Sequence, residues 1–158
     1  MLTPERQDAL ARIAVASVAC EKETGVPAEL TAAQCIFESG WLSQCPGNNC
    51  FGIKADTHGS GVQYVLTKEW ISGEYVSESL AFESYATLAD CFADHARLIQ
   101  SGVYAPVWQR YRADRNLDAF IKGVSAHYAT DPDYFVKIDG EAHSSTVQNA
   151  LQQVRAGN

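Results

Sequence analysis

The segment Ala33-Gln34-Cys35-Ile36-Phe37-Glu38-Ser39-Gly40-Trp41 decides how the rest of the sequence is interpreted. It forms the end of a helix predicted to begin near Pro27 and to end at Gly40. Glu38 falls in the last turn, where the negative end of the helix dipole and the apolar neighbours disfavour a charged carboxylate. A carboxyl group with a raised pKa can protonate a leaving oxygen, as a glycosidase requires. The alternative interpretation is an ordinary solvated glutamate near a helix end.

Length, charge and hydropathy limit the kinds of protein that this sequence can specify. The 158 residues suit a single domain, residues 1–158, and the net charge is −7. That charge argues against nucleic acid as a partner, because the dominant electrostatic interaction would be repulsive. The hydrophobic fraction is 46% and the charged fraction 20%, which is typical of a globular domain. Because the apolar runs all fall short of 18 residues, we expect no membrane insertion.

Helical patterns lie on both sides of a segment with a different composition. Thr3 and Pro4 predict the start of a first helix, and Gly25 its end. The middle segment is rich in small polar residues, and Val62–Trp70 and Glu74–Phe82 are predicted strands of a hairpin within a β lobe of residues 49–83. Further helices are expected from Thr87, over 106–112 and 116–126, from Asp131-Pro132 to a break at Gly140, and over 145–155. This order indicates an α+β, mainly helical domain.

Three further segments carry side chains suited to the same chemistry. The polar loop 48–54 follows the helix of Glu38 and is a candidate cleft wall, or an ordinary turn into a strand. Glu69, beside Trp70 on the hairpin, would complete an acid/base pair, or is simply an exposed glutamate. Tyr128 lies in the turn before a predicted helix, where its phenol could face a cleft or bond locally in the core.

Four segments in this order resemble the family 73 glycoside hydrolases, the β-N-acetylglucosaminidase domains of flagellar muramidases and many autolysins. Residues 33–41 resemble the AQ…ESGW segment of that family, and residues 49–54 resemble N-x-F-G-[IV]-K. Residues 82–85 resemble F-R-x-Y, with Glu83 in place of the arginine, and residues 128–134 resemble Y-A-T-D-P-x-Y. The resemblance extends from about Val26 to Ile138, nearly the whole chain.

The resemblance implies a lysozyme-like fold with the β-hairpin lobe beside the active-site cleft. It implies cleavage of the β-1,4 bond from N-acetylglucosamine to N-acetylmuramic acid in peptidoglycan. Glu38 would match the general acid, Glu69 the second acidic residue and Tyr128 the cleft tyrosine. The expected substrate-binding residues are Trp41, Asn49, Phe51, Trp70 and Asp131.

Five cysteines lie in the chain, and Cys45 and Cys50 bracket a short loop. We therefore expect these two to form a disulfide, while Cys20, Cys35 and Cys91 fall in apolar segments as small buried side chains. There is no CxxC pair and no HExxH spacing, so we expect no metal and no cofactor.

The apolar stretch 9–19 is interrupted by Arg12 and follows acidic residues, which is atypical of a signal peptide. We expect export without a recognisable N-terminal signal and action in the periplasm or cell wall of a target bacterium. A stand-alone glucosaminidase of this kind resembles a type VI secretion effector, which implies an immunity protein that blocks the cleft. The alternatives are a phage endolysin, a lytic transglycosylase and a non-catalytic module that binds glycan or a partner.

Overall fold

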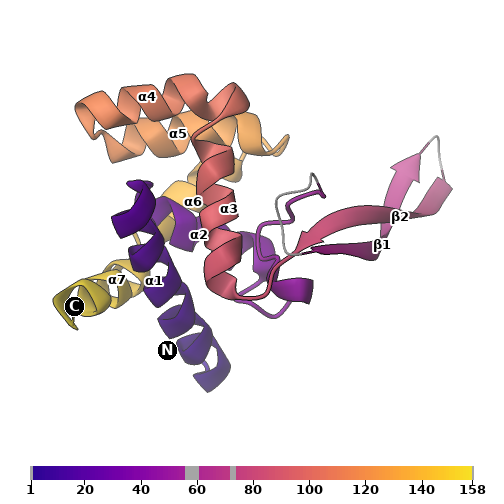
Figure 1. Cartoon of the computed structure of the whole chain (residues 1–158), viewed down its shortest axis with the longest axis horizontal. Helices are drawn as coiled ribbons and strands as arrows, with labels where there is room; N and C mark the ends of the chain where they lie inside the picture. Colours follow the sequence, from indigo (N-terminus) through magenta and orange to yellow (C-terminus); the bar gives the residue numbers. More distant parts are fainter. Residues whose placement is uncertain (1, 56–60, 72–73, 158) are drawn as a thin grey trace.

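The computed structural model describes residues 2–55, 61–71 and 74–157, with the backbone alone for 67–71 and 74–76. Within these residues the chain forms helices around a core, with a two-stranded hairpin that projects from them (Figure 1). The helices are α1 (Pro4–Thr24), α2 (Ala28–Ser39), α3 (Leu88–Ile99), α4 (Ala105–Asp114), α5 (Leu117–Tyr128), α6 (Tyr134–Ala142) and α7 (Ser145–Gly157). Two short 3-10 turns, η1 (Pro46–Asn48) and η2 (Gly102–Tyr104), and the strands β1 (Gly61–Ile71) and β2 (Glu74–Ser84) complete the described elements.

Local sequence signals set most helix ends, as predicted. The Thr3 side chain accepts a hydrogen bond from the Arg6 N–H at the start of α1, and Gly25 ends the helix with φ of 80°. At the start of α3, Thr87 and Asp90 form a reciprocal capping box. These bonds satisfy backbone groups that a helix leaves unpaired at its ends.

Helix α2 lies at the centre of the helical bundle. It packs against α1 on one side and α6 on another, while α1 also contacts α3 and α7 (Figure 1). Leu30 of α2, Ile13 of α1 and Ile138 of α6 are fully buried in this core. Each such side chain contributes about 1.5–3 kcal/mol on burial, so the core holds α2 firmly and fixes the position of its C-terminal end.

The hairpin pairs β1 with β2 antiparallel, from Gly61 opposite Ser84 to Ile71 opposite Glu74, and confirms the predicted hairpin. Its base is joined to the loop that follows α2. The Glu83 N–H donates to the Ile53 carbonyl oxygen (3.0 Å), and the Tyr85 N–H donates to the Gly47 carbonyl oxygen (2.8 Å). The loop and the hairpin therefore form one continuous wall beside the end of α2.

Helix α6 differs from its prediction at both ends. It begins at Tyr134, because the Asp131 carboxylate accepts from the Asp133 N–H and holds a turn before the helix. It also continues through Gly140 to Ala142. Burial of Ile138 and Ala142 on the core side outweighs the cost of about 1 kcal/mol for a glycine inside a helix.

Among the described residues, the helices are all too short or too polar to cross a lipid bilayer.

Candidate active site

A sharp turn ends α2 directly after Ser39, one residue beyond Glu38. Gly40 caps the helix in the left-handed conformation, and Trp41 and Leu42 continue with φ of 63° each. The buried Ser39 hydroxyl holds this turn, because it donates to the Cys35 carbonyl oxygen (2.6 Å) and accepts from the Leu42 N–H (2.9 Å). Left-handed geometry is unfavourable for residues other than glycine, so the serine compensates locally for backbone strain.

Glu38 is held by a chain of side-chain hydrogen bonds from α6 and α2. The Tyr134 hydroxyl donates to Glu38 Oε1 (2.8 Å) and accepts from Gln34 Nε2 (3.0 Å). Tyr134 is itself buried, with its ring edge-on to Phe37 at 5.6 Å between centroids. Because Gln34 and Glu38 lie one helical turn apart on α2, a single tyrosine can contact both.

Partial burial raises the pKa of the Glu38 carboxyl, in the direction that the sequence predicts, while the Tyr134 hydrogen bond acts in the opposite direction. The residue as a whole remains accessible to solvent, so the carboxyl is desolvated on its protein side only. Burial and the nearby Glu38 carboxylate also raise the pKa of the Tyr134 phenol, which stays a hydrogen-bond donor. The arrangement suits a carboxylic acid that gives its proton to a bound molecule.

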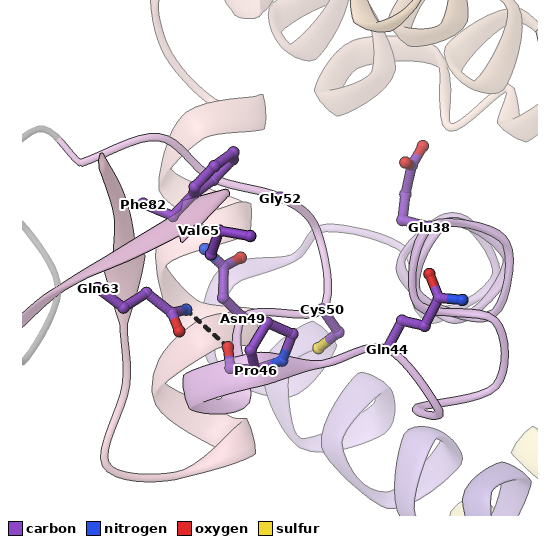
Figure 2. A pocket seen from close by; sticks show the side chains of 9 residues that line it. All are labelled: Glu38, Gln44, Pro46, Asn49, Cys50, Gly52, Gln63, Val65 and Phe82. Carbon is purple, nitrogen blue, oxygen red and sulfur yellow. Dashed lines mark hydrogen bonds between the residues drawn. The ribbon is translucent and has the colours of Figure 1, made fainter. Parts of the chain in front are cut away.

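Two cavities meet at Glu38. Figure 2 shows the first, of about 240 Å³, with Glu38 and Gln44 on one side and the hairpin side chains Gln63, Val65 and Phe82 on the other. The second, of about 560 Å³, extends from Glu38 toward Tyr104 and Tyr128. Glu38 and Gly52 line both cavities, so the acid lies midway along a cleft with room for sugar rings on either side.

Tyr128 lines the second cavity. Its hydroxyl donates to the Phe51 carbonyl oxygen (3.4 Å), and its ring stacks on Tyr134 at 5.7 Å between centroids. Phe51 lines the same cavity, but its ring is buried and stacks on His95 at 3.9 Å. Phe51 therefore lies at the bottom of the cleft, with its ring packed into the core instead of facing the cavity.

Asn49 lies in the wall of the first cavity, with its side chain bonded to backbone groups. Its Nδ2 donates to the carbonyl oxygens of Ile53 (2.9 Å) and Glu83 (3.0 Å), and its Oδ1 accepts from the Ile53 N–H (3.0 Å). Both amide hydrogens are thus engaged, and the structure gives Asn49 the role of joining the loop to β2. Its predicted contact with substrate stays a prediction.

Two of the predicted substrate-binding residues are not brought to the cleft. The left-handed turn carries Trp41 toward α1, where the Arg6 guanidinium lies over its ring at 5.4 Å. The Asp131 carboxylate binds Lys137 and the Asp133 N–H, and it holds the turn before α6. Neither residue lines the two cavities that contain Glu38, so the structure does not support these two predicted contacts.

Glu69 and Trp70 lie in β1, opposite Val76 and Tyr75, and their side chains are outside the described part of the structure.

All five cysteines are free thiols in the structure, and the Cys45–Cys50 disulfide stays a prediction. Cys20, Cys35 and Cys91 are buried, as predicted. Cys50 is also buried, because its loop folds back against α3.

Sequence reasoning missed Tyr134 and Gln34 as partners of the acid. Gln34 was visible one turn before Glu38 in a helix with an apolar face, where a buried amide needs a partner. Tyr134 lies 96 residues away from Glu38, and only the packing of α6 on α2 reveals its role.

A mainly helical domain, a small hairpin lobe and a partly desolvated carboxylic acid between them define the class of lysozyme-like glycoside hydrolase domains. The sequence profile of the family Glucosaminidase, described as mannosyl-glycoprotein endo-beta-N-acetylglucosaminidase, matches residues 14–144. The chain belongs to this glucosaminidase family.

Curated relatives and solved structures agree with this assignment. An autolysin of Enterococcus faecalis is 35% identical to this chain over 71% of the chain. The peptidoglycan hydrolase FlgJ of Salmonella typhimurium is 30% identical over 87% of the chain. The matched region spans only 16% of the length of the autolysin and 45% of the length of FlgJ. The FlgJ glycoside hydrolase domain superposes with a TM-score of 0.68 at 26% identity, covering 96% of this chain and 98% of that one. The catalytic domain of the Listeria monocytogenes autolysin Auto shares the fold, with a TM-score of 0.77 at 20% identity and coverage of 96% and 89%.

Proposed function

We propose that this protein is a peptidoglycan hydrolase, a β-N-acetylglucosaminidase that cleaves the β-1,4 bond between N-acetylglucosamine and N-acetylmuramic acid. The observation that carries the proposal is the Glu38 carboxyl, bonded to Tyr134 at the junction of two cavities. Membership of the glucosaminidase family and relatives named as autolysin and peptidoglycan hydrolase support the substrate class.

Glu38 acts as the general acid. Partial burial raises its pKa, which favours the protonated carboxyl that a general acid needs. The Tyr134 hydroxyl donates to Oε1, so the acidic proton resides on Oε2 and can pass to the glycosidic oxygen. After the transfer, the same hydrogen bond stabilises the carboxylate that remains.

A second group must activate water or stabilise the positive charge that develops on the sugar. We assign this role to Glu69 because its position in the hairpin sequence resembles that of the second acidic residue of the glucosaminidase family, to which the chain belongs. The acetamido group of the substrate is the alternative nucleophile. Replacement of Glu69 by Gln separates the two, because a substrate-assisted reaction does not need that carboxylate to form a bond.

The test is digestion of purified peptidoglycan, followed by borohydride reduction and mass spectrometry of the products. The wild type is expected to yield reduced N-acetylglucosamine ends, and Glu38→Gln none. Glu23→Gln, at an exposed glutamate of α1, is the matched control and should retain wild-type activity.

Other products would replace the proposal with a specific alternative. Reduced muramic ends would indicate a muramidase, and anhydromuramic ends a lytic transglycosylase. Binding of peptidoglycan without cleavage would indicate a non-catalytic module. Equal activity of wild type and Glu38→Gln would show that Glu38 is not the general acid.

We further propose that the enzyme acts outside the cytoplasm as an antibacterial effector, with an immunity protein that occludes the cleft. The proposed substrate lies outside the cytoplasmic membrane, and Glu38, at the junction of the two cavities, is accessible to solvent. Expression in a Gram-negative host should be toxic only when the protein is directed to the periplasm, and Glu38→Gln should abolish the toxicity. Lysis only when a holin is co-expressed would instead indicate a phage endolysin.

A further inference from the structure

Four of the five cysteines meet beside the cleft, on three separate parts of the chain. Cys50 lies at their centre, close enough to Cys35, Cys45 and Cys91 for all three to raise the pKa of its thiol. The Cys50 and Cys91 sulfur atoms are 3.8 Å apart, and both residues are buried. Cys45 is the member that remains partly open to solvent.

The arrangement suits exchange between thiols better than metal binding. A tetrahedral metal site needs several sulfur atoms close to one another as well as to the ion. Among the described residues, Asp118, Asp139 and His143 have ligand atoms close enough together to hold one metal ion, and this group contains no cysteine. The cluster instead places one sulfur atom, that of Cys50, within reach of several partners.

We propose that Cys45, Cys50 and Cys91 form a disulfide relay whose final product is a Cys50–Cys91 bond beside the active site. The oxidant is an external disulfide, such as oxidised glutathione or the disulfide of a thiol oxidoreductase. The relay is independent of the proposed hydrolase activity and is tested without it.

The relay has three balanced steps. The Cys45 thiolate attacks the external disulfide, forms a mixed disulfide and releases one thiol. Cys50 then loses its proton to solvent and attacks the Cys45 sulfur, which forms Cys45–Cys50 and releases the second thiol. Cys91 likewise loses its proton and attacks the Cys50 sulfur, which forms Cys50–Cys91 and returns Cys45 as a thiol. In total, two protein thiols lose two electrons and two protons, and the external disulfide gains them.

The environments of Cys45 and Cys50 favour this direction. Contact with Cys50 and the positive charge of Arg12 lower the pKa of the Cys45 thiol, so Cys45 is both the accessible nucleophile and a good leaving group. The neighbouring thiols of Cys35, Cys45 and Cys91, together with burial, raise the pKa of Cys50, so Cys45 is the better leaving group when the two are joined. The predicted Cys45–Cys50 bond thus becomes an intermediate.

The Cys50–Cys91 disulfide would fix the position of the cleft wall. Cys50 lines the first cavity with Glu38, as Figure 2 shows, and Cys91 lies on α3. A Cys50–Cys91 bond closes a loop of 42 residues, whereas Cys45–Cys50 closes one of six. The longer loop restricts the unfolded chain more, so the product bond should raise the melting temperature more than the intermediate does.

The experiment incubates the reduced protein with oxidised glutathione, alkylates the remaining thiols and maps non-reduced peptides by mass spectrometry. Trypsin with Glu-C cleaves after Glu38 and separates Cys35 from the segment that holds Cys45 and Cys50. Fragmentation of that segment then shows which of its two cysteines carries the alkyl group.

The wild type is expected to show Cys50 linked to Cys91, with Cys45 alkylated. Cys91→Ser should stop at Cys45–Cys50, and Cys45→Ser should form the final bond about tenfold more slowly. Cys20→Ser is the control, because Cys20 bonds to the Phe92 carbonyl oxygen outside the cluster, and it should match the wild type.

Three results in the wild type alone would overturn the proposal. They are a persistent Cys45–Cys50 bond, a bond from Cys50 to Cys35, and alkylation of all five cysteines after oxidation.

Discussion

Low pH is expected to destabilise this fold through one buried histidine beneath the cleft. His95 of α3 is fully buried between Phe51 and Tyr128, and its two ring nitrogens have no hydrogen-bond partner among the described residues. Burial lowers the pKa of His95 from 6.5 to about 3. The folded protein therefore holds a neutral imidazole at pH values where the unfolded chain holds a charged one.

The sign and size of the effect follow from proton linkage. Between pH 6.5 and 3 the unfolded state binds one more proton than the folded state, so the free energy of unfolding decreases as the pH falls. The slope approaches about 1.4 kcal/mol per pH unit. Between pH 7 and pH 4.5, His95 alone should remove about 2.5 kcal/mol of stability, a large part of a total of about 5–15 kcal/mol.

The assay is urea unfolding of the wild type and His95→Leu at pH 7 and at pH 4.5. Carboxylates such as Asp131, whose pKa is lowered by Lys137, contribute equally to both proteins. The wild type should therefore lose about 2.5 kcal/mol more than the variant between the two pH values. Equal losses would refute the reasoning, as would a titration of the His95 ring signals near pH 6.5 in the folded wild type.

Two substitutions test the hydrogen bonds that position Glu38 and the loop beside it. Tyr134→Phe removes the hydrogen bond to Glu38, so kcat should fall by about tenfold with little change in KM. Because that bond lowers the pKa of Glu38, the basic limb of the pH–rate profile should also move to higher pH, and an unmoved limb would argue against the bond. Asn49→Ala removes three hydrogen bonds to backbone groups and should cost about 2–4 kcal/mol in urea unfolding. A loss below about 1 kcal/mol would show that the loop holds its shape without that amide.

Much of the fold was predictable because its signals are local. Thr3, Gly25, Gly40 and Thr87 each mark a helix end through a side-chain bond or a left-handed conformation within a few residues. The hairpin follows from two alternating segments around a short turn. Where a local signal competed with packing, as at Gly140 in α6, the local signal was the weaker.

The candidate site was predictable in part for the same reason. The position of Glu38 in the last turn of α2 was predicted from the sequence, whereas partial burial in the folded protein raises its pKa. The direction of Trp41 did not follow, because it depends on a run of left-handed residues held by Ser39.

The sequence by itself determined the helices, the hairpin and the acid at the end of α2, since each depends on residues within one or two turns of chain. Only the tertiary structure decided which groups surround that acid. The bond from Tyr134 to Glu38 and the contact of Cys50 with Cys91 join residues 96 and 41 positions apart. Such pairs form because buried apolar faces pack α6 on α2 and the loop on α3, and that packing depends on the whole core.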